Sequence, residues 1–340
     1  MQYSPAPFFV IDTAYYVVPK TDLDMQWLYY AIKHHKLGEV DDGSPIPSTT
    51  RSAVYMLDLD VPPPEQQRAI AQILGALDAK IELNQRMNET LEAIARTLFK
   101  SWFVDFDPVH AKAKGRDPGL PEGLAALFPD SFESSGLREI PHGWRHGTLG
   151  EIAENPHRIV QPSRIDPAAP YIGLGHMPQR SISLSKWGCA EDLESSKFEF
   201  AEGEILFGKL RPYFHKVGLA PVDGVCSTDI LVVRPKDSIW FGFVLGHVAS
   251  DEFIAYANSG ATGTRMPRTT WQEMARYELI VPPRQVVAQY NDYLEIFTKR
   301  VIANIHEART LASLHETLLP KLISGELRIR NAERFSGGRS

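Results

Sequence analysis

The sequence is poor in cysteine and contains no long apolar run. Its two cysteines, Cys189 and Cys226, are too few for a disulfide framework or a four-thiolate zinc site. No segment approaches the roughly 18 consecutive apolar residues that a membrane-spanning helix needs. The N-terminus also lacks the basic start of a secretory signal peptide. We therefore expect a cytoplasmic protein in a reducing environment that has no membrane partner.

An excess of positive charge is also missing. The chain has 36 Lys+Arg against 42 Asp+Glu, and its formal net charge is -6. Such a balance gives no overall attraction to nucleic acid, so DNA binding would depend on local basic segments. The 340 residues, 43% of them hydrophobic and 23% charged, are typical of a globular protein with roughly two domains.

Recognisable catalytic motifs are absent as well. Residues Gly203–Lys209 approach the phosphate-binding loop pattern, but Leu210 replaces the required Ser or Thr and Pro212 interrupts the helix that must follow. His306 and His315 each lack a second histidine four residues later, which excludes the helical zinc protease motif. We therefore predict no catalytic residues, no metal site and no enzymatic activity.

The sequence does contain a long internal repeat. Residues 43–102 align without a gap on residues 263–322, at a shift of 220 positions. Residues 11–20 resemble residues 227–236 at a slightly different shift. Aligned pairs include Val61 with Val281, Pro62 with Pro282, Pro63 with Pro283, Asn84 with Asn304, Leu91 with Leu311, and Leu98 with Leu318. The repeat predicts two copies of one unit, each a globular part followed by a long helix.

Each copy carries a heptad-like apolar stripe that predicts one long helix. The stripes follow the prolines at 62–64 and 282–283, and proline is tolerated in the first turn of a helix. A helix of about 38 residues would be roughly 57 Å long. Neither stripe can stay exposed, so we expect the two helices to pair with each other. The expected pairing residues are Ile70, Leu74, Leu77, Ile81, Asn84, Leu91, Leu98, Leu294, Phe297, Val301, Asn304, Leu311 and Leu318.

Asn84 and Asn304 occupy the same position of the stripe in the two copies. A polar residue in the seam of paired helices selects their register and pairing state, at some cost in stability. We assign this role to both asparagines, in preference to binding a ligand.

The segment between the two helices has a different composition. Residues 107–143 are rich in Pro, Gly and charge, which is typical of a connector. Residues 144–280 alternate short apolar runs with turns and indicate an α+β domain. We expect strands at Tyr171–Ile172, Glu204–Phe207, Val217–Ala220 and Ile230–Val233, and one helix from Trp240 to Asn258 that Gly260 ends.

Two segments of this domain combine positive charge with hydroxyl, aromatic and turn residues. Lys and Arg on such loops reach phosphates, Arg also pairs with guanine edges, and threonine hydroxyls suit phosphate oxygens. The candidate DNA-binding residues are Lys209, Arg211, Tyr213, His215, Lys216, Thr262, Thr264, Arg265, Arg268 and Thr269. The structural alternatives are that Arg211 pairs with Asp229 and that Trp271 belongs to the core.

Three segments resemble those of type I restriction–modification specificity (S) subunits. Residues 62–109, which begin PPPEQQRAIAQILGALDAKIELNQ, are similar to the central conserved region of that family. Residues 281–327, which begin VPPRQVVAQYNDYLEIFTKR, resemble its distal conserved helix. Residues 127–144, LFPDSFESSGLREIPHGW, are similar to the lead-in to its second target recognition domain.

The resemblance implies an α+β fold in which two long antiparallel coiled-coil helices separate target recognition domains with pseudo-twofold symmetry. Each domain would read one half of a bipartite site in double-stranded DNA, and the helix pair would set the spacing between the halves. The implied protein is a non-catalytic subunit that binds no cofactor itself. It would recruit methyltransferase (M) subunits, which bind S-adenosylmethionine, and through them restriction (R) subunits that use ATP and Mg.

The repeat and the resemblance together divide the chain into six expected parts. These are 1–60, the C-terminal part of a first recognition domain; 61–106, the central helix; 107–143, the connector; 144–281, the second recognition domain; 282–326, the distal helix; and 327–340, a tail. Residues 144–224 precede the strand that corresponds to residues 11–20, whereas almost nothing precedes it in the first copy. We therefore expect a first recognition domain truncated at its N-terminus.

A different class of protein explains the helices equally well. A coiled-coil scaffold that recognises another protein, and does not read DNA, would carry the same apolar stripes. It would not explain the basic loops of residues 208–216 and 262–271. Salt-dependent DNA binding separates the two possibilities, because phosphate contacts make affinity fall as salt rises.

Overall fold

The computed structural model describes residues 3–4, 6, 9, 16–35, 54–135, 138–263, 265–330 and 332. The chain divides into two units, one of residues 1–84 with 307–340 and the other of residues 85–306. The strand expected at residues 11–20 lies partly outside the described residues, and residues 16–20 form no strand. Within the described residues, no helix combines the length and apolar character that crossing a membrane requires.

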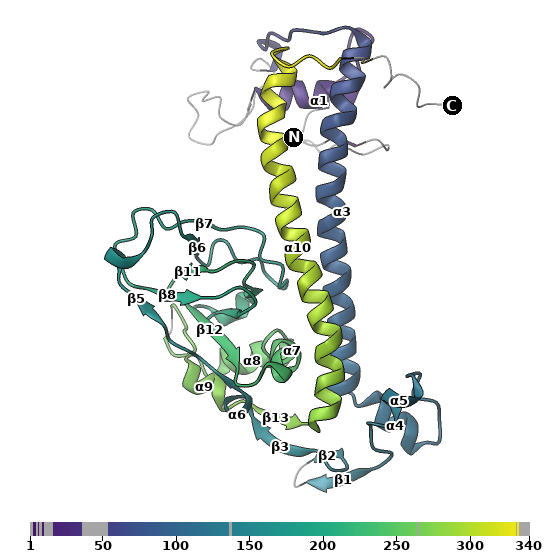
Figure 1. The fold of residues 1–340 in the computed structure, drawn as a ribbon, viewed down its shortest axis with the longest axis vertical. Helices are drawn as coiled ribbons and strands as arrows, with labels where there is room; N and C mark the ends of the chain where they lie inside the picture. The colour runs from purple at the N-terminus through teal and green to yellow at the C-terminus, as the bar shows by residue number, and fades with distance from the viewer. Residues whose placement is uncertain are drawn as a thin grey trace. The chain divides into compact units, whose positions relative to one another are not determined.

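Two long helices, α3 (Pro64–Phe103) and α10 (Arg284–Ile323), each 40 residues in length, contribute to both units (Figure 1). Their starts follow from the prolines, because α3 begins at Pro64 and α10 begins directly after Pro282-Pro283. Gly325 ends α10 with φ of 73°, and the Leu327 N–H donates to the Lys321 carbonyl at 2.8 Å. The two long helices predicted from the stripes are confirmed.

In the first unit, helix α1 (Met25–His34) packs on the two long helices. Asp24 caps it by accepting from the N–H groups of Gln26 and Trp27. Buried α1 residues share an apolar cluster with residues of α3 and α10: Trp27, Leu28, Tyr30, Ala31, Ile32, Ile70, Ala71, Leu74 and Leu322. The Tyr30 hydroxyl donates to Asp78 at 2.8 Å, and burial raises its pKa above the ordinary value. Burial and this hydrogen bond therefore fix α1 to the first half of α3.

The second unit is built on two β-sheets. One contains, in spatial order, β10 (Val217–Leu219), β9 (Ile205–Gly208), β12 (Ile230–Pro235) and β4 (Ala153–Glu154). The other contains β5 (Ile159–Val160), β8 (Lys197–Phe200), β11 (Gly224–Cys226), β6 (Pro170–Ile172) and β7 (Gly188–Cys189). The β6–β11 pair is parallel, and the other pairs are antiparallel. The strands expected from the four apolar runs are confirmed in β6, β9, β10 and β12.

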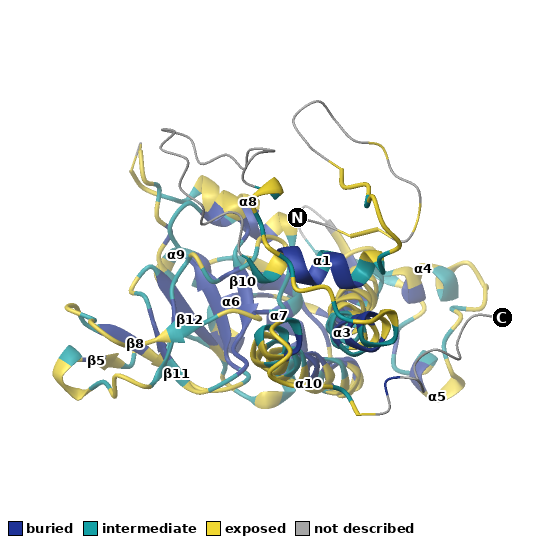
Figure 2. Ribbon diagram, turned by 90° about the horizontal axis from the view of Figure 1, so that it is seen from above, coloured by how far each residue is buried: buried dark blue, intermediate teal, exposed yellow. Residues whose placement is uncertain are grey.

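Strand β9 shows how the sequence positions the core of this unit. Its side chains alternate between the two faces of the sheet, as in any strand. Ile205 and Phe207 belong to a large cluster that includes residues of α3 and α10, whereas Leu206 belongs to a second cluster with Ile172 and Cys226. Both faces of β9 are buried, and its residues are apolar along its length. Figure 2 shows dark blue, buried strands beside the β12 label in the same unit.

The helical part of the unit differs from the single helix expected at residues 240–258. Two helices are present, α7 (Phe241–Val248) and α8 (Asp251–Ser259), so that expectation is wrong. The break follows from Ser250, which has extended backbone angles and caps α8 by accepting from the Phe253 N–H at 3.1 Å. Gly260 is the C-cap of α8.

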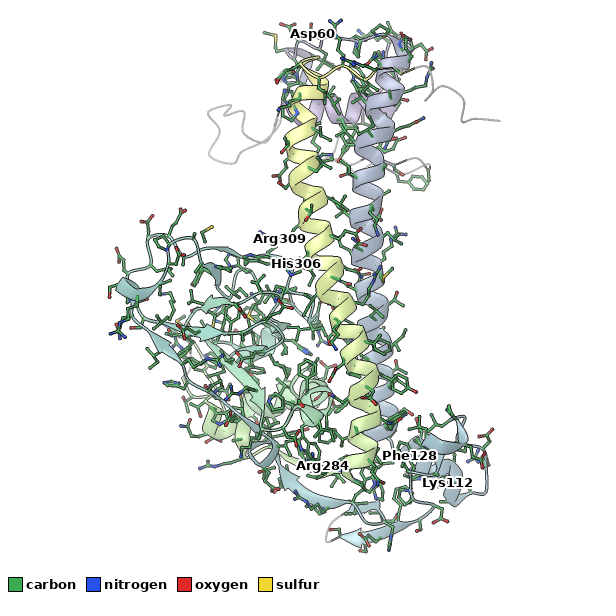
Figure 3. All side chains as sticks on the ribbon, viewed as in Figure 1. Asp60, Lys112, Phe128, Arg284, His306 and Arg309 are labelled. Atoms are coloured by element: carbon green, nitrogen blue, oxygen red, sulfur yellow. The ribbon has the colours of Figure 1, made fainter. Side chains whose placement is uncertain are left out.

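Residues 107–143 contain regular structure of their own. They form α4 (Asp107–Ala113), α5 (Glu122–Ala125) and a hairpin of β1 (Phe132–Ser135) with β2 (Arg138–Pro141). Lys112 Nζ donates to the carbonyls of Ala125 and Phe128, which ties α4 to the end of α5 (Figure 3). After the hairpin, β3 (Arg145–Thr148) pairs with β13 (Glu278–Val281), and α6 (Leu149–Ile152) and α9 (Trp271–Ala275) flank this pair.

Candidate nucleic-acid interface

The long helices contact each other in antiparallel order. In the first unit, Asn84 Nδ2 donates to Glu307 Oε2 at 2.9 Å. In the second unit, Asn304 Nδ2 donates to Asn88 Oδ1 at 2.7 Å, and the Tyr290 hydroxyl donates to the Ala95 carbonyl at 3.1 Å. Residue numbers rise along α3 as they fall along α10, which is the order that antiparallel helices require.

The residues expected in the helix seam lie at two levels of burial. Fully buried are Ile70, Leu74, Asn84, Leu294, Val301 and Asn304. Half-buried are Leu77, Ile81, Leu91, Leu98, Phe297, Leu311 and Leu318. Asn84 and Asn304 do not bond to each other, because each pairs with a different residue of the opposite helix. Asn88, which the sequence prediction did not assign to pairing, is the partner of Asn304.

The structure brings the two basic segments of the globular domain together. The Arg211 N–H donates to the Pro267 carbonyl at 2.7 Å, and the Thr269 N–H donates to the Lys209 carbonyl at 3.1 Å. Leu210 and Arg268 form an antiparallel bridge between these bonds. Segments that are some fifty residues apart in sequence therefore form one short ladder, which we call the joined basic loops (residues 208–216 and 262–271).

Within the joined basic loops, Arg268 carries the ion pair that was considered for Arg211. Arg268 Nε donates to Asp229 Oδ1 at 3.2 Å, and the Lys209 N–H donates to the Asp229 carbonyl at 2.9 Å. The alternative that Arg211 pairs with Asp229 is thus wrong. Arg211 has a left-handed backbone, with φ of 51°, and no described residue accepts a hydrogen bond from its buried Nε.

Positive charge at the joined basic loops is only partly neutralised. In the described ranges no carboxylate forms an ion pair with Lys209, Arg211 or Arg265, and Arg265 is exposed. Tyr213 is 51% exposed and lies beside Phe214 with ring centroids 4.8 Å apart. Unpaired cations next to exposed aromatic rings are suited to contacting a nucleic acid backbone and stacking on its bases.

His215 is buried and Lys216 is half-buried. His215 is 7% exposed, its Nε2 bonds to the Ala249 carbonyl at 3.0 Å, and its Nδ1 lies 3.3 Å from Asp251 Oδ1. Burial lowers the pKa of this imidazole, which favours the neutral form. Lys216 Nζ donates to the Leu174 carbonyl. Both side chains thus bond to carbonyls of the protein, and their contact with DNA stays a prediction.

The threonines of the second basic segment are divided between surface and core. Thr262 is exposed, and its N–H and carbonyl form a bridge with Arg268 at 3.0 Å in both directions. Thr269 is 1% exposed, so its hydroxyl faces the interior. Thr264 lies outside the described residues. Trp271 is half-buried and packs against the main core, as the structural alternative predicted.

Two exposed residues of the same loops were missing from the sequence prediction. Phe214 and Met266 are 37% and 46% exposed. Their position inside the basic segments was the available signal, but apolar side chains are normally assigned to the core. Among the residues that the structure describes, no group of three or more His, Cys, Asp or Glu side chains could hold a metal ion.

Comparisons with known proteins point to one family. Residues 1–93 match the family described as Type I restriction modification DNA specificity domain. The specificity subunit of the type I restriction enzyme MjaIX from Methanocaldococcus jannaschii is 24% identical over 329 residues, which are 92% of this chain and 71% of that protein. The HindI specificity subunit from Haemophilus influenzae is 27% identical over 332 residues, 83% of this chain and 71% of that protein. By these matches the chain is similar to type I restriction–modification specificity (S) subunits.

The fold of this chain is also found in a solved structure. The S subunit of a type I restriction–modification system from M. genitalium covers 88% of this chain and 73% of its own, with 16% identity and a TM-score of 0.51. A mixed α+β fold with two long helices packed together is thus shared. The matched family model is described as a DNA specificity domain, and both relatives are specificity subunits of type I restriction enzymes.

Proposed function

We propose that residues 144–281 of this S subunit form a target recognition domain that reads one half of a bipartite DNA site. The observation that carries the proposal is the ladder that joins residues 209–211 to residues 267–269. It gathers Lys209, Arg211 and Arg265 on one surface, next to the exposed ring of Tyr213. In this proposal Arg268 contacts DNA when it exchanges Asp229 for a phosphate, and Thr262 and Thr264 supply hydroxyl contacts.

We assign His215, Lys216 and Thr269 to the support of these loops. The burial of His215 and Thr269, and the bonds of His215 and Lys216 to the carbonyls of Ala249 and Leu174, support this assignment. A loop that contacts DNA must be held in a fixed position, because a bidentate contact to a base edge depends on geometry.

We also propose that the chain is an internal repeat with pseudo-twofold symmetry. Helix α1 packs on Ile70 and Leu74 at the start of α3 and on Leu319 and Ile323 at the end of α10. Helix α7 packs on Tyr290 and Leu294 at the start of α10 and on Phe99 and Phe103 at the end of α3. A shift of 220 positions relates the four long-helix residues that contact α1 to the four that contact α7. This correspondence supports the proposal.

The six-part division of the chain follows the same proposal. Residues 1–60 belong to a first recognition domain, 61–106 and 282–326 to the two helices, 107–143 to the connector and 327–340 to the tail. We further propose that the helices recruit M subunits that bind S-adenosylmethionine, and through them R subunits that use ATP and Mg. Such a complex would act in the cytoplasm, and this chain itself would bind none of these cofactors.

The test uses the full chain assembled with its M subunit. Mapping of methylated bases in cells that express this complex identifies the DNA sequence, and binding to that duplex is then measured over a range of salt concentrations. We expect log affinity to fall linearly with log salt, with a slope of about −0.9 for each phosphate contacted. Arg265→Ala should weaken binding by about 1–3 kcal/mol if Arg265 reads a base, or reduce the slope by about 1 if it contacts a phosphate.

The matched control is Arg234→Ala. Arg234 lies on β12 and pairs with Glu154, so its removal changes the net charge equally without touching the joined basic loops. Binding that is independent of salt would favour the scaffold alternative. An equal loss of affinity in the Arg234 and Arg265 variants would contradict the assignment of this surface.

A further inference from the structure

A buried carboxylate on α3 holds a loop of the globular domain. Glu92 is 8% exposed and accepts hydrogen bonds from the Ser181 hydroxyl at 2.9 Å and from the N–H groups of Ile182 and Ser183, each at 3.1 Å. The Ser183 hydroxyl donates to the same carboxylate. Both oxygens of Glu92 are therefore used, in a contact between residues that lie about ninety positions apart in sequence.

This contact defines both position and direction. Burial of a carboxylate is unfavourable unless donors replace the water that it loses, and here four donors converge on it. Two of the donors are backbone N–H groups, whose direction is set by the path of the chain. Glu92 therefore determines where residues 181–183 lie relative to α3, whereas apolar packing alone would allow the surfaces to slide.

The loop held by Glu92 is bonded in turn to the joined basic loops. The Arg180 N–H donates to the His215 carbonyl at 2.9 Å, and His215 ends the short 3-10 helix Pro212–Phe214, which presents Tyr213. On its other side, the Leu219 N–H donates to the Ile182 carbonyl at 2.9 Å. Leu219 lies on β10, and β10 pairs with β9, which leads into Lys209. Two short series of hydrogen bonds thus connect Glu92 to the joined basic loops.

Other contacts between this domain and the helices use fewer hydrogen bonds at each place. The Gly242 N–H donates to Asn291 Oδ1 at 2.9 Å, and Arg96 Nη2 donates to the Arg180 carbonyl at 3.4 Å. Phe99 and Phe103 of α3 pack on Phe243 of α7 through ring contacts at 6.1 and 4.9 Å. His306 of α10 (Figure 3) is hydrogen-bonded through Nε2 to the carbonyl of Pro221 at 2.8 Å. The aromatic contacts supply burial, and the His306 bond attaches a turn next to β10. Glu92 supplies the several directed bonds closest to the loop of residues 211–216.

We propose that Glu92 is a positioning residue for DNA recognition: it fixes the basic loop of residues 211–216 at a set place on α3. The proposal rests on the DNA-reading function proposed above. As a consequence, the domain that reads one half-site keeps a constant orientation relative to α3, which in this proposal helps to set the spacing between the two DNA half-sites. Without Glu92 the domain still folds and still binds its half-site, but it takes more than one orientation relative to α3.

The distance between α3 and the loop tests this proposal directly in the full chain. Spin labels at Gln85→Cys and Tyr213→Cys, in a Cys189→Ser background that removes the exposed native thiol, report one distance within the second unit. We expect a single narrow distribution in the otherwise unchanged protein. Glu92→Ala should cause loss of that single peak, and Glu92→Asp, which keeps the charge but is one methylene shorter, should do the same.

Two further variants make the result specific. Glu92→Gln keeps the shape and one acceptor oxygen, so it should restore most of the narrow peak if directed hydrogen bonds are what matters. Glu89→Ala removes an exposed carboxylate of the same helix and should leave the distribution unchanged. If Glu92→Ala does not fold, the comparison of Glu92→Asp with Glu92→Gln carries the test. An unchanged distribution in Glu92→Ala, or equal broadening in Glu89→Ala, would overturn the proposal.

A DNA measurement separates this proposal from the function on which it rests. With the chain assembled with its M subunit, Glu92→Ala should relax the preference for one spacing between half-sites and leave the affinity for a single half-site unchanged. Absence of DNA binding in the unchanged protein would refute the proposed function, while the distance experiment would still decide the role of Glu92. A full loss of half-site affinity in Glu92→Ala would overturn the positioning role.

Discussion

Asn304 of α10 donates its side-chain N–H to the side-chain carbonyl of Asn88 on α3, over 2.7 Å and with both residues buried. Asn88 also donates to the Val301 carbonyl at 3.4 Å. A shift of either helix by one turn would break both bonds and bury unpaired amides, which is costly. The pair therefore selects one register of the two helices.

Replacement of one member of this pair should destabilise the protein. Asn304→Ala leaves the buried side-chain oxygen of Asn88 without its hydrogen-bond donor, and we expect the free energy of unfolding to fall by about 1–3 kcal/mol. Urea denaturation measures the change. Gln85→Ala, an exposed polar position of α3, is the control and should stay within about 0.5 kcal/mol. Equal effects of the two substitutions would contradict the register assignment.

Removal of the charge of Asp229 should strengthen DNA binding. Asp229 accepts from Arg268 at 3.2 Å and so neutralises one cation of the joined basic loops. Asp229→Asn would free Arg268 for a phosphate, and we expect the salt slope of DNA binding to steepen by about 1. Glu154→Gln, which frees Arg234 on β12, is the matched control. Weaker binding by the Asp229 variant would show that the ion pair orders the loop for recognition.

His247 should make the protein sensitive to mild acid. Burial among Phe99 and Phe243 lowers its pKa from 6.5 to about 3, because the charged form cannot be solvated there. Between about pH 6.5 and 3, His247 is therefore protonated in the unfolded chain but neutral in the folded chain. Stability is complete above pH 6.5 and falls with pH through that window, by up to about 1.4 kcal/mol per pH unit from this residue.

The measurement is the difference in unfolding free energy between pH 7.5 and pH 5.5. His247→Phe should reduce this difference, whatever its effect on stability at neutral pH. It should not abolish the difference, because the pKa values of His215 and His315 are also lowered by burial. His146→Gln, at an exposed position, should leave it unchanged. An acid sensitivity that His247→Phe does not alter would rule out this source.

Gly246 allows α7 to approach α3 closely. A Cβ placed there would lie 2.2 Å from the Phe99 ring, whose movement is restricted by the core around it. Gly246→Ala should therefore cost about 1–3 kcal/mol of stability through overpacking. Gly123→Ala, in α5 with open space around the added methyl, is the control for the loss of a helical glycine. Thermal unfolding that is equal in the two variants would be evidence against close packing at Gly246.

Gly75→Ala refines this comparison. Its added Cβ would also be close to another atom, 2.2 Å from Nε2 of Gln26, but this atom is the end of a flexible side chain. Gln26 can move aside, so the cost at Gly75 should be smaller than at Gly246. The ranking Gly246, then Gly75, then Gly123 is the expected order of destabilisation.

Much of the fold could be predicted because its signals are local. Prolines at 62–64 and 282–283 and the apolar stripes behind them are sufficient to start and sustain α3 and α10, since helix periodicity depends on residues three and four apart. Short apolar runs likewise predicted β6, β9, β10 and β12. The helix expected at 240–258 failed because apolar content does not reveal a break, whereas the cap at Ser250 depends on one side chain and its backbone angles.

The candidate site could be predicted in composition but not in arrangement. Both basic segments were recognisable from Lys, Arg, Thr and turn residues. Their joining, the pairing of Arg268 with Asp229 and the inward position of His215 depend on where strands β9 and β12 place distant segments. Composition cannot distinguish a cation that faces solvent from one that satisfies a buried carbonyl.

By itself, the amino-acid sequence determined the two long helices, and it predicts the repeat that relates them and the similarity to S subunits. These depend on periodicity and on similarity along the chain. Only the tertiary structure decided which asparagines meet, which cations stay unpaired and that Glu92 holds residues 181–183. The physical reason is that hydrogen bonds and ion pairs depend on distances of a few ångströms, and folding brings distant residues within that range.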